Sequence, residues 1–535
     1  MLFNSYVFLF IFLPVTLYGF HLIGKQGHHK VAISWLVVAS LIFYGWWNPA
    51  YLGLILGSIL FNYALGFFLL GRPYKWILFI GIAGNLAVLG YFKYANFFID
   101  NINALTSNNI VLEQIILPLG ISFFTFQQIT YLVDVYRGET KEYNFLHYCL
   151  FVVFFPQLIV GPIVHHKEML PQFAKDVLYK LNSKNLAVGF TIFIIGLFKK
   201  VVLADGIATY ATPVFAAAEN GVFLTFFEAW AGALAYTFQL YFDFSGYSDM
   251  AIGLARMFGI TLPVNFSSPY KANNIAVFWR RWHITLSRLI KDYLFYPISL
   301  SLTRFAVIKN YGSVRLFILT ILIPTMFTFF WVGLWHGAGW NFILFGLAHG
   351  TYIVIYSAWV QIKPSIPDNR VIKSTVIANS IGRVVTFLAI VLSLVVFPAE
   401  SIDGAGNMLA AMLGGHGLSL SPSLIGRIGN LEPWLLGHGI VFHGMFHNHA
   451  FGVNPKAGVV WVVALFLIAM LLPNTQQLLG RYRPVLEIYK NEVPRLSHRW
   501  MEWRPSILWA FFTFSIFIIA ILNLTQTSEF LYFQF

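Results

Sequence analysis

The stretch Trp331-Val332-Gly333-Leu334-Trp335-His336-Gly337-Ala338-Gly339-Trp340-Asn341 lies in the middle of a long uncharged segment. From Leu316 to Ile362 the sequence contains no Asp, Glu, Lys or Arg. An ionisable side chain among apolar spans is costly unless it is paired, so His336 is a candidate functional residue. The alternative is a packing role, in which backbone carbonyls satisfy both ring nitrogens.

The composition is that of a protein with many membrane spans. Of the 535 residues 58% are hydrophobic and 10% are charged, and the mean hydropathy is +0.71. Soluble domains contain roughly 25% charged residues. The apolar runs are long and uninterrupted, which excludes the short alternating segments of an outer-membrane barrel. Helices remain as the way to satisfy the backbone in lipid, so we predict an all-α polytopic membrane protein.

The apolar runs predict eleven to thirteen membrane segments in one integral membrane domain, residues 1–535. The segment Ile115–Val133 contains Pro118 and Gly120 and is expected to be broken or re-entrant. Uninterrupted spans are expected near Tyr6–Leu22, Val31–Trp47, Tyr51–Leu70, Trp76–Tyr91, Leu146–Val164, Leu186–Leu203, Ala229–Phe242, Leu316–Leu334, Asn341–Val360, Ile377–Phe397, Val459–Leu472 and Ile507–Leu524. The N-terminal run lacks a basic n-region and a cleavage site, so it is expected to be a span rather than a signal peptide.

The distribution of Lys and Arg predicts the orientation. The first loop contains Lys25 and Lys30, and six basic residues precede the last span, whereas residues 525–535 contain none. The positive-inside rule therefore places both termini, including the aromatic tail 525–535, outside the cytoplasm. The net charge of +13 sits in loops between apolar runs, which favours anionic lipid headgroups over nucleic acid as its partner.

Metal binding is not expected. Cys149 is the single cysteine, so neither an internal disulfide nor a cysteine-based metal site is possible. The histidines 438, 443, 447 and 449 suggest a metal site, and His443 and His447 could share a helix face. Their Gly-rich surroundings and the lack of nearby acidic residues favour an exposed loop instead.

The segment Lys271–Ile298 is too charged to span a membrane and too aromatic for an ordinary solvated loop. It contains Phe278-Trp279-Arg280-Arg281-Trp282-His283-Ile284-Thr285-Leu286-Ser287. An amphipathic helix that lies at the cytoplasmic face, or dips into it, fits this composition. The alternative is simple anchoring to the membrane surface through the two arginines.

Four motifs together resemble the membrane-bound O-acyltransferase family. They are Phe155–Pro162, Tyr241–Gly253, Phe278–Ser287 followed by Asp292-Tyr293-Leu294, and Trp335-His336-Gly337. They resemble most the bacterial branch that acts in alginate O-acetylation, peptidoglycan O-acetylation and teichoic-acid D-alanylation, with the strongest match over about 117–397. The resemblance implies a helical bundle around a transmembrane tunnel with His336 at its centre. Donor would enter from the cytoplasm and acceptor from outside.

The residue types suit acyl transfer to a hydroxyl. A neutral imidazole has a pKa of about 6.5 and can take the hydroxyl proton, so His336 is expected to be the base. Gly337 and Gly339 permit a helix break beside it, and Asn341 could bind the imidazole or the oxyanion. His349, thirteen residues beyond His336, is expected to face elsewhere if the helix is continuous.

Other residues are expected to have supporting roles. His283 matches the second histidine of the family pattern, with a positioning or supporting proton role. Arg280 and Arg281 are expected to bind the phosphates or acidic groups of a donor such as acetyl-CoA or an acyl carrier protein. Asp249 and its neighbour Asp243 are expected to hold helices together or to orient an imidazole of the tunnel.

The last six residues, 530–535, are apolar or aromatic apart from Gln534. They resemble the tyrosine-bearing terminal motif of the partner protein of teichoic-acid D-alanylation, which implies that Tyr532 is an acyl carrier. Two alternatives remain, an interfacial aromatic anchor and a remnant of a protease-tag site, from which Phe530 and Phe535 depart.

The sequence therefore predicts a multi-pass O-acyltransferase of the bacterial inner membrane. It is expected to transfer an acyl group, in the first place acetyl, to envelope polysaccharide through a periplasmic acetyltransferase partner. The alternatives are a transporter, which would show repeat symmetry and acidic intramembrane sites, and a scaffold for a periplasmic transferase. The sequence does not identify the polysaccharide.

Overall fold

The computed structural model describes residues 1–140, 144–362, 375–447, 450–452, 454–489, 492–494, 496, 499–524 and 531. Within these residues there are helices and a single isolated bridge, Ser419 to Val441, but no strand. The expected all-α fold is thereby confirmed. Seven helices are long and apolar enough to cross a membrane, and three shorter apolar helices accompany them. The predicted eleven to thirteen segments also included the buried helix α12 (Phe226–Met257) and the broken region from α6 (Ile121–Tyr136) to α9 (His166–Phe173).

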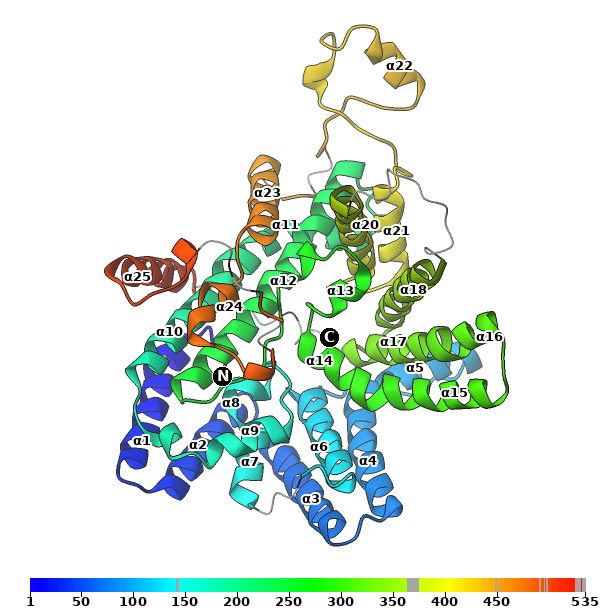
Figure 1. Cartoon of the computed structure of the whole chain (residues 1–535). Helices are drawn as coiled ribbons and strands as arrows, with labels where there is room; N and C mark the ends of the chain where they lie inside the picture. Colours follow the sequence, from blue (N-terminus) through cyan, green and yellow to red (C-terminus); the bar gives the residue numbers. More distant parts are fainter. Residues whose placement is uncertain are drawn as a thin grey trace.

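The N-terminal third forms one side of the molecule (Figure 1). Its helices are η1 (Phe8–Phe12), α1 (Leu13–Lys25), α2 (His29–Gly45), α3 (Tyr51–Gly71), α4 (Lys75–Leu89), η2 (Gly90–Tyr94), α5 (Ala95–Thr106) and α6 (Ile121–Tyr136). The π-turn η2 joins α4 to α5, so that residues Lys75–Thr106 are one continuous apolar helix. Helix α6 begins only after Gly120, whose φ of 71° lies in the left-handed region, as the predicted break requires.

The span expected over Leu146–Val164 is not one helix. The chain forms α7 (Phe145–Val153), α8 (Phe155–Leu158) and α9 (His166–Phe173), with a break at Phe154. Pro156 lies in the first turn of α8 and lacks the backbone N–H that a helix continuing from α7 would need, which accounts for the break. This region is almost wholly buried and packs inside the protein rather than against lipid.

Helix α12 (Phe226–Met257) is the central element. It packs against α10 (Ser183–Phe198), η4 (Lys199–Ala204) and α11 (Asp205–Glu219). Glycines allow the backbones to approach closely, since a Cβ at Gly196 would lie 2.5 Å from the carbonyl oxygen of Gly246. Such small-residue contacts replace the hydrophobic driving force that is missing between helices in lipid.

The segment expected as one amphipathic helix over Lys271–Ile298 is broken. It forms α13 (Ile275–Trp279), α14 (Ile284–Ile290), the π-turn η6 (Lys291–Phe295) and the start of α15 (Tyr296–Ile308). His283, with φ of 43°, lies between α13 and α14 in the left-handed region. The helix cannot continue through such a residue, so the segment folds into the protein and Trp282 and His283 are buried.

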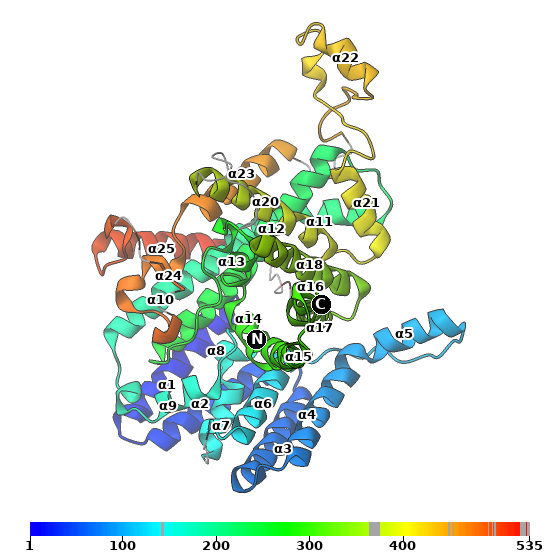
Figure 2. The same ribbon diagram turned by 45° about the vertical axis from the view of Figure 1, so that its right-hand side comes forward.

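The remaining helices surround this centre. Figure 2 shows α17 (Ile323–His336) and α18 (Trp340–Ile362) as a hairpin beside α14, and α22 (Leu431–Gly437) on a lobe that projects from the body. The others are α16 (Ser313–Phe317), η7 (Ile318–Leu322), α20 (Thr375–Val396), α21 (Ile402–Met412), α23 (Pro455–Leu471), α24 (Thr475–Leu478) and α25 (Ile507–Leu522).

Candidate active site

His336 is the last residue of helix α17. Gly337 is extended, with φ of −165° and ψ of 158°, and the chain enters α18 three residues later. The helix break expected at the glycines is therefore present. His349 was expected to face elsewhere only if the helix were continuous, and the helix is broken. Helix α18 folds back along α17, and His349 lines the same cavity as His336.

Two cavities meet at His336. The first, which we call the loop cavity, has about 530 Å³ of empty space, part of it open, and is lined by Lys93, residues 117–123, Ile159, Val160 and Trp335. The second, the aromatic cavity, has about 330 Å³ of empty space. Its lining includes Phe278, Trp279, Trp282, Phe345, Phe397 and His349. His336 lines both cavities, and its residue surface is only 5% exposed.

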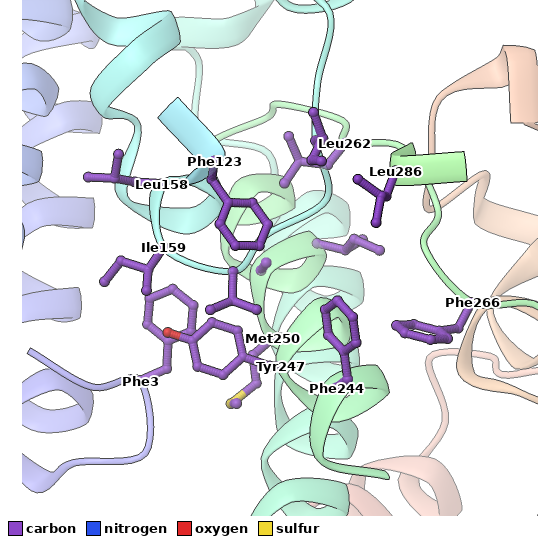
Figure 3. Close-up of a cluster of buried hydrophobic side chains, with 14 of the residues drawn as sticks. Phe3, Phe123, Leu158, Ile159, Phe244, Tyr247, Met250, Leu262, Phe266 and Leu286 are labelled. Carbon is purple, nitrogen blue, oxygen red and sulfur yellow. The ribbon is translucent and has the colours of Figure 1, made fainter. Parts of the chain in front are cut away.

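Apolar side chains exclude water from the site. The ring of His336 lies 4.9 Å from that of Trp335 and 5.3 Å from that of Phe397, both edge-on. Beside the loop cavity, Phe123 and Ile159 belong to the large buried cluster in Figure 3, with Phe244 on the other side of the cluster. In such surroundings a hydrogen bond to a charge that develops in a reaction is worth more than in water.

His283 is held by a side chain that the sequence motifs did not indicate. Its Nδ1 lies 3.0 Å from Oδ1 of Asn265, and both residues are at most 1% exposed. The same oxygen accepts hydrogen bonds from the hydroxyl of Thr285 at 3.0 Å and from its backbone N–H at 3.4 Å. An N–H can only donate, so this atom of Asn265 is the amide oxygen and Nδ1 of His283 carries the proton.

The other ring nitrogen of His283 is consequently a bare acceptor. Its Nε2 is buried and has no hydrogen-bond partner within the described part of the chain. Burial lowers the pKa of His283 to about 3, so the imidazole is neutral at physiological pH. The ring lies edge-on to Phe244 at 4.8 Å and 6.1 Å from the ring of Trp335. The structure thus brings both predicted histidines to one centre around Trp335.

Asn341 and Asp249 contact other groups than His336. The Asn341 amide donates to the carbonyl oxygen of Ala399 at 2.8 Å, which ties the start of α18 to the chain after α20. The Asp249 carboxylate accepts hydrogen bonds from Lys199 at 2.7 Å and from Thr475 at 2.6 Å. These contacts join η4 and α24 to α12, as expected for an acid that holds helices together.

Arg280 and Arg281 belong to a larger basic patch. Arg280 is exposed and Arg281 is half-buried. Burial, then Arg280 and Arg383, lower the pKa of Arg281, while Glu492 opposes them. The pKa of Lys271 is lowered too, first by burial and second by the charge of Arg281. We call Lys271, Arg280, Arg281 and Arg383 the basic patch. Its cations repel one another, so an anionic ligand would be stabilised there.

Lys93 and Tyr94 are a further part of the site that sequence reasoning missed. The Lys93 ammonium donates to the backbone carbonyls of Trp335 and His336, and the Tyr94 hydroxyl donates to that of Leu334 at 2.9 Å. A lysine inside an apolar run could have been noticed, but the predicted span ended at Tyr91, just before it. Nothing local in the sequence connects it with His336, which is 243 residues away.

Tyr532 lies outside the described residues, but Leu531 is described. The backbone N–H of Leu531 donates to Oδ2 of Asp243 at 3.1 Å, and Lys200 pairs with the same carboxylate at 2.6 Å. Leu240, one turn earlier on α12, lines the aromatic cavity. Leu531 therefore lies at the wall of the central bundle.

The described residues contain no group of three or more His, Cys, Asp or Glu side chains that could hold a metal ion. The rings of His443 and His447 lie 6.1 Å apart on the projecting lobe, and His438 is exposed beside Trp434. His449 lies outside the described residues. The sequence prediction that no metal is bound stays a prediction.

The comparisons with known proteins agree with the geometry. The model of the membrane-bound O-acyltransferase (MBOAT) family matches residues 41–397. A peptidoglycan O-acetyltransferase of Helicobacter pylori is 42% identical over 451 residues, which are 78% of this chain and 81% of that protein. The probable alginate O-acetylase AlgI of Pseudomonas aeruginosa is 40% identical over 423 residues, 77% and 75% of the two chains. A teichoic acid D-alanyltransferase of Bacillus subtilis is 30% identical over 256 residues, 47% and 62%.

Proposed function

We propose, since this chain belongs to the membrane-bound O-acyltransferase family, that it moves an acetyl group from a cytoplasmic donor to hydroxyl groups of an envelope polysaccharide. The donor is a thioester, acetyl-CoA or an acyl carrier protein. A periplasmic acetyltransferase partner completes the transfer, and the protein resides in the bacterial inner membrane. Two relatives that act as O-acetyltransferases at about 40% identity support acetyl as the acyl group.

The observation that carries this proposal is that His336 lines two cavities. A transferase across a membrane needs donor and acceptor to reach one base from separate directions. The acceptor hydroxyl gives its proton to His336, its oxygen bonds to the thioester carbonyl carbon, and the carbon–sulfur bond breaks. The thiolate then takes the proton from the imidazolium, which returns His336 to its neutral form.

The basic patch supports a donor that enters beside the aromatic cavity. Arg280 directly follows Trp279, which lines that cavity, and the patch belongs to a segment rich in basic residues. The positive-inside rule assigns such segments to the cytoplasm. A CoA phosphate or an acidic carrier protein is the kind of ligand that four neighbouring cations attract.

The tail supports a role for Tyr532 as an acyl carrier. Leu531, its neighbour, is hydrogen-bonded to α12 one turn from a residue of the aromatic cavity. A phenol has a pKa of about 10, so a phenyl ester releases its acyl group more readily than an alkyl ester. Tyr532→Phe keeps the aromatic packing and removes only the hydroxyl. Loss of polymer acylation in this variant would support the carrier, and unchanged acylation would assign the tail to anchoring.

Transfer into sealed vesicles tests the proposal as a whole. The purified protein is reconstituted in liposomes with radiolabelled acetyl-CoA outside and an oligosaccharide acceptor with the partner inside. Labelled acceptor ester should appear with the parent protein and not with His336→Ala. A transporter would instead accumulate labelled donor inside without forming ester. A scaffold would form ester only when donor is enclosed together with the partner, and it would do so equally well with His336→Ala. Acetyl-loaded carrier protein replaces acetyl-CoA in a parallel reaction.

A further inference from the structure

We propose that Lys93 is a catalytic residue that donates a hydrogen bond to the oxyanion formed during acyl transfer. This inference rests on the proposed function, because it supplies the second half of the chemistry for which His336 supplies the base. It is carried by the position of one lysine, which contacts the end of α17 although it lies 243 residues from His336 in the sequence.

The first observation is the position of Lys93 in the fold. It lies in the π-turn η2, inside the continuous apolar helix Lys75–Thr106. π-turns inside helices occur frequently at functional sites, since the extra residue redirects side chains. Here the turn directs Lys93 to the end of α17, where the helix stops at His336.

The second observation is the pair of groups that Lys93 binds. Its Nζ donates to the carbonyl of Trp335 at 2.5 Å and to that of His336 at 3.1 Å. The last carbonyls of a helix lack intrahelical partners and carry the negative end of its dipole, so a cation is favoured there. The ammonium is thereby fixed relative to the backbone of the proposed base.

The third observation is what Lys93 lacks. Throughout the described part of the chain it forms no ion pair with a carboxylate, and its two hydrogen bonds go to neutral carbonyls. An ammonium has three N–H donors, so one remains. A cation in an apolar span without a counter-ion is costly and therefore marks a functional position.

The fourth observation is the cavity. Lys93 and His336 both line the loop cavity, whose other walls are mostly apolar. When the acceptor oxygen attacks the thioester carbonyl, the carbonyl π electrons move to its oxygen and a negative charge develops. The remaining N–H of Lys93 donates to that oxygen. As the carbon–sulfur bond breaks, the oxygen lone pair re-forms the carbonyl and the charge leaves on the thiolate. A fixed donor of this kind needs no reorganisation when the reaction occurs.

The experiment compares kcat and KM for acetyl transfer in the vesicle assay for the parent, Lys93→Met and Lys93→Arg. Loss of one oxyanion donor costs a factor of about 100 to 1,000 in kcat. We expect Lys93→Met to lose that much with KM within threefold, and Lys93→Arg, which keeps a cation and donors, to recover part of it. Lys75→Met, an exposed lysine of the same helix, is the matched control and should keep the parent kcat.

Chemical rescue separates a donor from a structural residue. In a Cys149→Ser background, Lys93→Cys is alkylated with 2-bromoethylamine, which rebuilds an ammonium of nearly the same length, and mass spectrometry verifies the product. Rates are expressed per folded molecule, as judged by size-exclusion chromatography. At least tenfold recovery of kcat supports the inference. An unchanged kcat in Lys93→Met, or no recovery after complete alkylation, overturns it.

The same assay keeps this inference distinct from the proposed function. If the parent forms no acetyl ester with any donor, the proposed function fails, and the role of Lys93 fails with it. If the parent is active, His336→Ala is inactive and Lys93→Met keeps its kcat, only the assignment of Lys93 fails.

Discussion

The helix end that carries His336 and the turn that carries His283 bring two imidazoles to one centre by different means. His336 is positioned through its own backbone: the helix stops at Gly337, and Lys93 holds the final carbonyls. His283 sits in a left-handed turn, and its ring is held through a side chain, Asn265. The first arrangement fixes where the residue lies, whereas the second also fixes which ring nitrogen carries the proton.

The difference matters for what each histidine can do. A base must offer a lone pair, and the rings of Trp335 and Phe397 lie edge-on to the imidazole of His336. His283 has its tautomer set, with Nδ1–H directed at Asn265 and a bare Nε2. A buried acceptor without a partner costs about 1 to 3 kcal/mol. A substrate hydrogen atom, or a proton in transit, would remove that cost.

The largest effect is expected from His336→Ala, which removes the proposed base. General-base catalysis contributes a factor of about 100 to 10,000, so acetyl transfer should fall to the detection limit while membrane insertion and folding persist. The measurement is ester formation per folded molecule. His438→Ala, an exposed histidine of the projecting lobe, is the control and should match the parent. Normal transfer by His336→Ala would end the catalytic interpretation of this helix end.

A smaller loss is expected when the partner of the second imidazole is removed. Asn265→Leu keeps a buried side chain of similar size but frees the tautomer of His283, and misplacement of a catalytic group by about 1 Å can cost a factor of about 100. We expect kcat to fall tenfold to a hundredfold. Asn62→Leu is the control: Asn62 is a buried amide paired with Asn85 between α3 and α4. It should lower the melting temperature without lowering kcat per folded molecule.

These two regions also show what can be read from sequence. The spans, the break at Gly337 and the candidate role of His336 follow from local composition, because an uncharged run and its glycines are adjacent in the chain. The partners Asn265 and Lys93 are not adjacent to the residues they hold, at separations of 18 and 243 residues. Their importance comes from hydrogen bonds that exist only after folding. The same holds for His349, whose place in the cavity follows from the way α18 folds back along α17.

A pH profile sharpens the contrast between the two imidazoles. The pKa of His283 is about 3 because the ring is buried, so in the parent its protonation cannot limit the rate above about pH 4. In Asn265→Asp a carboxylate faces Nδ1 and favours the charged ring, which raises the pKa of His283. Transfer should then be lost as pH falls through the raised pKa and be retained above it. An acid limb at the same pH in Asn265→Asp and the parent would contradict the assignment.

The smallest effect is expected at the basic patch. Arg280→Ala combined with Arg281→Ala removes two cations that would bind donor phosphates, while Lys271 and Arg383 remain. A hydrogen bond to a charged group is worth about 1.5 to 3 kcal/mol. Solvent around this exposed site lowers that contribution, so KM for acetyl-CoA should rise about tenfold with kcat nearly unchanged. The effect should shrink at high salt, since exposed charges are screened there. Arg427→Ala, on the projecting lobe, should leave KM unaltered. If the double variant instead lowers kcat at saturating donor, the patch acts on the histidines rather than on the donor. The assignment of the patch to donor binding would then be wrong.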